Sequence, residues 1–91
     1  MIVTKEEMKQ YLRVDYEDDD SLIESFIMGA EKTCMDIIRT DDAEEFYRVD
    51  NAKIAVMYAV AYLYEHREEA DHHAMLMTLR ALLFGDRREG F

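Results

Sequence analysis

Carboxylates are the most numerous side chains in this sequence that could take part in chemistry. Four of them are contiguous: Glu17, Asp18, Asp19 and Asp20. No basic side chain occurs between Arg13 and Lys32 to neutralise them. An EF-hand loop beginning at Asp15 would need Gly at its sixth position and Glu at its twelfth, where the chain has Asp20 and Phe26. We therefore interpret the block as a strongly anionic edge of the folded protein, and not as a calcium site.

The three histidines are the second group with a possible chemical role. His72 and His73 each follow a glutamate by four residues, a helical spacing that can hold a metal ion but more commonly forms a surface ion pair. A small metal-dependent enzyme using His66, His72 and His73 is the weakest hypothesis, because HExxH is absent. The chain also has no GxGxxG, Walker-type loop or nucleophile elbow. We assign no catalytic, cofactor-binding or metal-binding residue, and we expect Cys34, the only cysteine, to be buried and inert.

The acidic composition of the chain limits the kinds of molecule that it is expected to bind. A formal net charge of -10 argues against binding to nucleic acid, because such binding depends on Lys and Arg. It also argues against binding to an anionic membrane surface. The longest apolar stretch, residues 54–64, is too short to span a bilayer, so we expect a protein that is intracellular and soluble where it is made. A small acidic chain could also be a DNA mimic that inhibits a DNA-binding host protein. That alternative predicts a stable monomer or dimer with strongly salt-dependent binding.

Apolar periodicity predicts an all-α protein, a small bundle of about four helices in one domain, residues 1–91. We expect helices over residues 4–14, 20–39 and 50–64 and a fourth ending at Phe84. Thr4 and Glu7 have the spacing of a capping box, and Gly29 inside the second helix suggests a close approach between helices. The third helix is apolar on nearly every face, which indicates cover from neighbouring subunits. Residues 40–49 have no assigned role, and whether the third and fourth helices are continuous is left open.

Three segments carry a resemblance to a known family. They are KQYLRVDYEDDDSLIESFIMGAEK, AVAYLYEHREEA and LRALLFGDRREGF. Together, in this order, they resemble the head–tail connector (head-completion adaptor) family of long-tailed bacteriophages. The residues that match the family pattern are Leu12, Arg13, Asp19, Asp20, Leu22, Ile23, Tyr64, Arg67, Leu82, Leu83 and Arg87. We expect most of these residues to be structural.

The resemblance implies a noncatalytic helical protomer without a cofactor, located in the virion at the head–tail junction. It implies a dodecamer-like ring that docks under the portal protein, extends the DNA channel and receives the next head-completion or tail protein. DNA would pass through the ring without being specifically bound, and no membrane is involved. The candidate channel-facing residues are Glu17, Asp18, Asp19 and Asp20. The candidate portal-docking residues are Arg87, Arg88 and Phe91.

Overall fold

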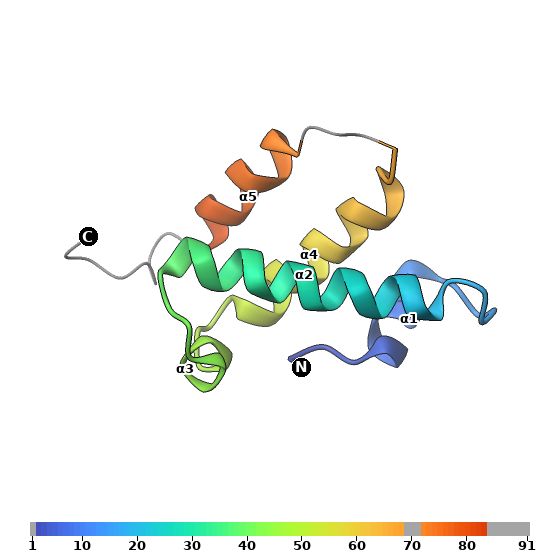
Figure 1. The fold of residues 1–91 in the computed structure, drawn as a ribbon, viewed down its shortest axis with the longest axis horizontal. Helices are drawn as coiled ribbons and strands as arrows, with labels where there is room; N and C mark the ends of the chain where they lie inside the picture. Colours follow the sequence, from blue (N-terminus) through green and yellow to red (C-terminus); the bar gives the residue numbers. More distant parts are fainter. Residues whose placement is uncertain (1, 69–71, 84–91) are drawn as a thin grey trace.

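Five helices make up the part of the chain that the structure describes. The computed structural model describes residues 2–68 and 72–83. The helices are α1 (Lys5–Leu12), α2 (Asp20–Ile38), α3 (Ala43–Tyr47), α4 (Ala52–Glu65) and α5 (His73–Leu83). The prediction of a small all-α bundle is confirmed, although the short α3 falls in the segment to which the sequence assigned no structure. Helices α4 and α5 are separate, since α4 ends at Glu65 and α5 begins at His73 (Figure 1).

Local sequence signals set the ends of the first two helices. The capping box is confirmed: the Thr4 hydroxyl accepts from the Glu7 N–H, and the Glu7 carboxylate accepts from the Thr4 N–H, both at 3.0 Å. Helix α1 ends at Leu12, two residues earlier than expected, because Arg13 adopts the left-handed conformation with φ 61°. Helix α2 ends at Ile38 in the same way, because its C-cap residue Arg39 has φ 64°. In both cases the backbone N–H of the arginine bonds back to the last turn, as in a C-cap motif.

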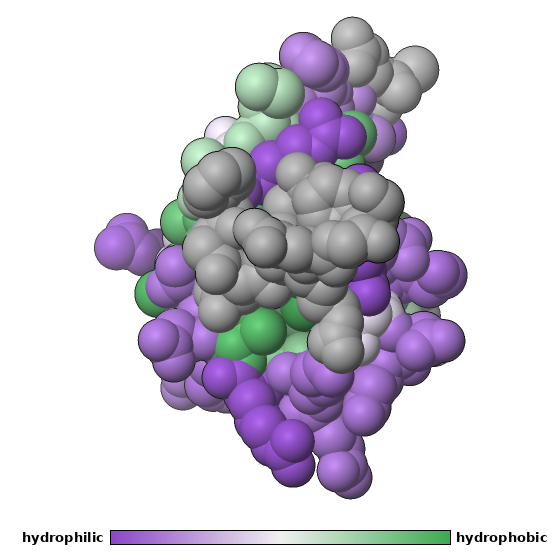
Figure 2. Space-filling model, turned by 90° about the vertical axis from the view of Figure 1, so that its left-hand side faces the viewer, coloured by the Kyte–Doolittle hydropathy of each residue, from purple (hydrophilic) through white to green (hydrophobic). Residues whose placement is uncertain are grey.

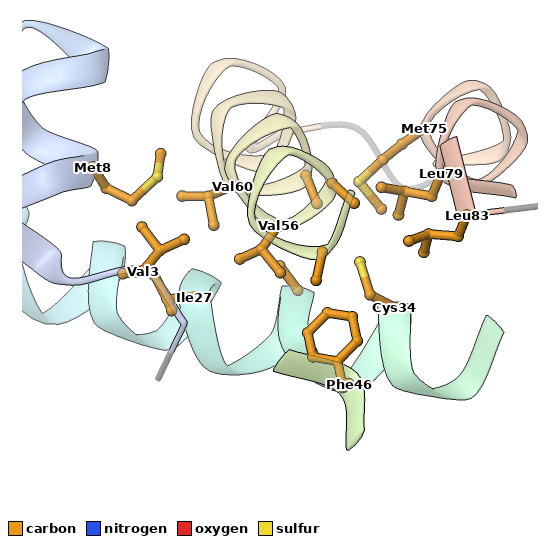
Figure 3. Close-up of a cluster of buried hydrophobic side chains, with 14 of the residues drawn as sticks. Val3, Met8, Ile27, Cys34, Phe46, Val56, Val60, Met75, Leu79 and Leu83 are labelled. Atoms are coloured by element: carbon orange, nitrogen blue, oxygen red, sulfur yellow. The ribbon is translucent and has the colours of Figure 1, made fainter. Parts of the chain in front are cut away.

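The core lies between α2 and α4. The apolar stripe of α2 is buried: Ile23, Ile27, Ala30, Cys34 and Ile38. Helix α4 covers this stripe with small and β-branched side chains: Ala52, Ala55, Val56, Ala59 and Val60. Helices α1 and α5 close the two sides, with Met8 from the first and Leu79 and Leu83 from the second (Figure 3). Among the described residues, no polar or charged residue is buried.

Helix α3 is held by a single aromatic side chain. Phe46 is fully buried in the core, whereas the adjacent Tyr47 is 39% exposed. The Asp42 carboxylate caps the helix by accepting from the Glu44 N–H at 3.0 Å. The segment that the sequence left unassigned is therefore a short capped turn of helix with one anchor.

Two sequence interpretations on the helices need revision. Gly29 is not a close-approach point within this chain, because it is exposed and no atom lies within 4 Å of a Cβ placed there. Helix α4 is largely covered by its own chain, yet Ile54 is 58% exposed. The expected helix end at Phe84 lies outside the described residues.

Candidate functional site

Polar side chains from two segments of the family pattern meet at one end of the molecule, where α4 reaches the start of α2. The Tyr64 hydroxyl donates to the Asp19 Oδ2 at 2.8 Å and lies 3.2 Å from the Tyr16 hydroxyl. Arg67 places its Nη1 3.8 Å from the Asp19 Oδ1 and its Cζ 4.8 Å from the centre of the Tyr64 ring. We call Tyr16, Asp19, Tyr64 and Arg67 the Asp19 cluster. Hydrogen bonding to Tyr16 and to Asp19 raises the pKa of Tyr64, so its phenol stays a donor.

Asp20 ties the same end of α2 to α1. Its Oδ1 lies 2.7 Å from the Lys9 Nζ and its Oδ2 lies 3.4 Å from the Lys5 Nζ. The ion pair with Lys9, followed by the contact with Lys5, holds the pKa of the Asp20 carboxyl below its ordinary value. The four-residue spacing of Lys5 and Lys9 on α1 could have predicted that both lysines face one carboxylate.

The acidic block is therefore divided into two pairs that differ in exposure and in contacts. The side chains of Asp19 and Asp20 are only 21% and 23% exposed, and both carboxylates contact other parts of the chain. Glu17 and Asp18 are exposed and have no such contact among the described residues. The sequence singled out Asp19, Tyr64 and Arg67 separately, but nothing in it indicated that the three residues touch.

The other residues of the family pattern lie mostly in or beside the core. Ile23 and Leu83 are fully buried, and Leu12, Leu22 and Leu82 are partly buried. The Leu82 carbonyl accepts from the Asn51 side chain at 2.9 Å, which ties the end of α5 to the start of α4. Arg13 is exposed at the C-cap of α1. Arg87, Arg88 and Phe91 lie outside the described residues.

The hypothesis of a metal enzyme gains no support. No group of three or more His, Cys, Asp or Glu side chains within residues 2–68 and 72–83 is placed to hold a metal ion. The His66 ring stacks on Tyr62, with ring centres 4.1 Å apart, and its Nδ1 lies 2.9 Å from the Tyr62 carbonyl. Cys34 is buried as predicted, and burial raises the pKa of its thiol to about 12, so the reactive thiolate is disfavoured.

Several open grooves mark the surface of the described chain, and two of them lie between helices. A groove of about 420 Å³ between α1 and α4 has tyrosines on its walls, and we call it the tyrosine groove. It is lined by Tyr11, Leu12, Arg13, Tyr58, Ala61, Tyr62 and Glu65. A second groove of about 370 Å³ lies between α2 and α5 and includes Ile37, Leu76 and Arg80. Among the coloured atoms in Figure 2, hydrophilic side chains predominate, with a smaller apolar area between them.

These features define a class: a small helical module with open surface grooves, an apolar core and polar contacts that join its helices. None of the helices described is long and apolar enough to cross a membrane. The model of the phage gp6-like head–tail connector protein family matches residues 3–80, and the chain belongs to this family. No curated protein and no solved structure gave a significant match. Membership confirms the resemblance seen in the sequence, and it implies a structural component of a phage virion.

Proposed function

We propose that this chain is a noncatalytic subunit of a connector ring that docks under the portal, extends the DNA channel and presents an attachment surface for the next completion or tail protein. The observation that carries the proposal is the family match over residues 3–80, which includes α1 to α4 completely and most of α5. This match favours a connector over the DNA-mimic alternative, since the family is one of structural proteins. The ring is expected to be dodecamer-like.

The anionic edge supports a conduit that does not hold DNA. Phosphates are attracted by Lys and Arg, so a lumen lined with carboxylates repels the passing duplex. Of the four candidate channel-facing carboxylates, Glu17 and Asp18 are exposed, whereas Asp19 and Asp20 contact groups of their own chain. We therefore assign the channel-facing role to Glu17 and Asp18, and the positioning of their loop to Asp19 and Asp20.

The docking surface for the portal is assigned to Arg87, Arg88 and Phe91. Two adjacent arginines and an aromatic residue are the side-chain types most often used to anchor an interface. They follow α5 in sequence, and α5 ends at Leu83 next to the start of α4. An acidic surface on the portal would complement them.

The position of the protein in the particle tests the proposal. Cryo-electron microscopy of DNA-filled capsids, with the protein labelled, should show a ring of this chain under the portal. Capsids that retain their DNA and join tails in the absence of the protein would reject the connector role.

The docking assignment is tested separately with an Arg87→Glu, Arg88→Glu double variant, which should fold normally and be lost from capsids. Arg48→Glu, an exposed arginine at the end of α3, is the control.

A further inference from the structure

The tyrosine groove presents an aromatic surface that no part of the described chain fills. Tyr11 is 56% exposed on one wall, and Tyr58 and Tyr62 form the other wall with ring centres 6.2 Å apart. Glu65 is exposed at the rim, one turn beyond Ala61. Arg13 is exposed on the α1 side of the groove. Aromatic walls with a carboxylate on the α4 side favour an apolar side chain, with a cation beside Glu65 and away from Arg13.

Helix α5 carries a surface with those properties. Its buried side consists of Met75, Leu79 and Leu83. Its opposite side is exposed and small or apolar: Ala74, Met77 and Ala81. Arg80 is exposed on the flank of the helix that also lines the groove between α2 and α5. Met77 is 51% exposed, and Arg80 lies one turn further along the same helix. Small residues on either side of one long flexible side chain allow this helix to approach another surface closely.

The two surfaces lie on opposite sides of the molecule. Helices α1 and α5 flank α4 from opposite sides above α2 (Figure 3). Within one chain the outer face of α5 therefore cannot reach the groove between α1 and α4. Glu65 and Arg80 have no ion pair with any other described residue, so each is available to a second molecule.

We propose that α5 of one subunit docks into the tyrosine groove of the next, with Met77 against Tyr58 and Tyr62 and with Arg80 paired to Glu65. A thioether beside aromatic rings is a favourable contact, and opposite charges fix the register. Because the two surfaces differ, the contact is heterologous and generates a closed ring or an open filament. The inference rests on the proposed function, for which it supplies the contact between subunits.

Charge explains why such a local pairing is needed. Each chain carries a formal net charge of -10, so identical subunits repel one another at long range. Assembly then requires places where an exposed cation of one copy meets an exposed carboxylate of the next. Arg80 and Glu65 offer this arrangement beside surfaces that are both partly apolar.

A charge exchange tests the contact. Glu65→Arg and Arg80→Glu are introduced singly and together into the full chain, and the copies of the protein at the portal are counted in DNA-filled capsids. Each single variant places like charges opposite each other and should reduce incorporation by about tenfold or more. The double variant restores opposite charges at every contact between subunits and should recover incorporation. Asp50→Arg and Arg48→Glu, at exposed positions outside both surfaces, are the matched controls. Far-UV circular dichroism of every variant verifies that it folds.

The outcomes separate this inference from the proposed function. Suppose that the wild type forms a ring at the portal. The contact is then overturned, and the connector role stays intact, if the folded single variants incorporate normally. The same conclusion follows if the double variant incorporates no better than either single variant. A wild-type protein absent from the portal would overturn both. As a second readout, Ala61→Cys with Met77→Cys in a Cys34→Ala background should give intermolecular disulfides in assembled particles, and neither single cysteine should do so. Absence of this cross-link in assembled rings would also reject the contact.

Discussion

Tyr64 donates a 2.8 Å hydrogen bond to Asp19, a residue 45 positions earlier in the chain. The contact joins the end of α4 to the start of α2, and Arg67 lies against both residues. The two residues belong to separate segments of the family pattern. These segments are far apart in the sequence, yet each contributes one side chain to the same polar contact. This contact also fixes the position from which Glu17 and Asp18 project.

Removing the Tyr64 hydroxyl should weaken the fold without creating a cavity. Tyr64→Phe leaves the Asp19 carboxylate without its phenol donor, at an expected cost of about 1 kcal/mol. Thermal unfolding followed by circular dichroism should show a melting temperature lower by about 4–8 °C. The control is Tyr11→Phe, which removes a hydroxyl from a tyrosine that is 56% exposed. Equal melting temperatures for Tyr64→Phe and the wild type would show that the Asp19 cluster adds no stability.

The ion pairs of Asp20 should make stability depend on pH in the acid range. The folded-state pKa of Asp20 is lowered, first by the ion pair with Lys9 and then by Lys5. Its contribution is therefore complete above the unfolded pKa of about 4 and is lost as the pH falls through the lower folded value. Urea unfolding should show that acidification from about pH 5 to about pH 2 destabilises the wild type more than Asp20→Asn. Asp18→Asn, at an exposed position, should follow the wild type, and identical curves for Asp20→Asn and the wild type would contradict the assignment.

Phe46 should be the residue on which α3 depends. Phe46→Ala empties a fully buried site and should destabilise the protein by about 3–5 kcal/mol. For a small domain this is a large share of the total stability, which is typically about 5–15 kcal/mol. Chemical denaturation measures the loss, and Tyr47→Ala, at a position 39% exposed, should change stability by about 1 kcal/mol or less. Comparable losses from the two variants would show that α3 is not anchored by Phe46.

Gly29 offers a stabilising substitution. It lies inside α2, is exposed and has no atom within 4 Å of an added Cβ. Gly29→Ala should therefore raise the free energy of unfolding by about 0.5–1 kcal/mol, because alanine loses less backbone entropy in a helix. The measurement is the midpoint of urea unfolding of the isolated protein, with Ser25→Ala on the same exposed face as the control. A lower midpoint for Gly29→Ala would mean that its surroundings are not open.

The long helices were predictable because their signal is local. The apolar stripe of α2 repeats over five turns, and the capping box of α1 needs only four residues. Helix α3 has five residues and one buried side chain, which is too little for any periodicity to be seen. Its anchor, Phe46, was visible only as an apolar residue in an acidic segment.

The misread and missed features depend on the tertiary arrangement. The sequence shows that Gly29 interrupts a helix, but it does not show whether a neighbour lies beside that glycine. The hydrogen bond from Tyr64 to Asp19 joins residues 45 positions apart, with α2 and α3 lying between Asp19 and α4 in the sequence. Spacing along a single sequence therefore cannot reveal it. The lysines that hold Asp20 are different, since their four-residue separation on α1 is a pattern that a systematic search could use.

The core of the described chain contains apolar side chains alone, while the polar contacts that join its helices lie at its edges. An interior of this kind accepts exchange among Leu, Ile, Val and Met as long as total volume is kept. Divergence between related chains should therefore accumulate inside the protein with little effect on its architecture. The few carboxylate, tyrosine and basic positions at the ends of the helices should change more slowly and serve as the traceable record of common descent.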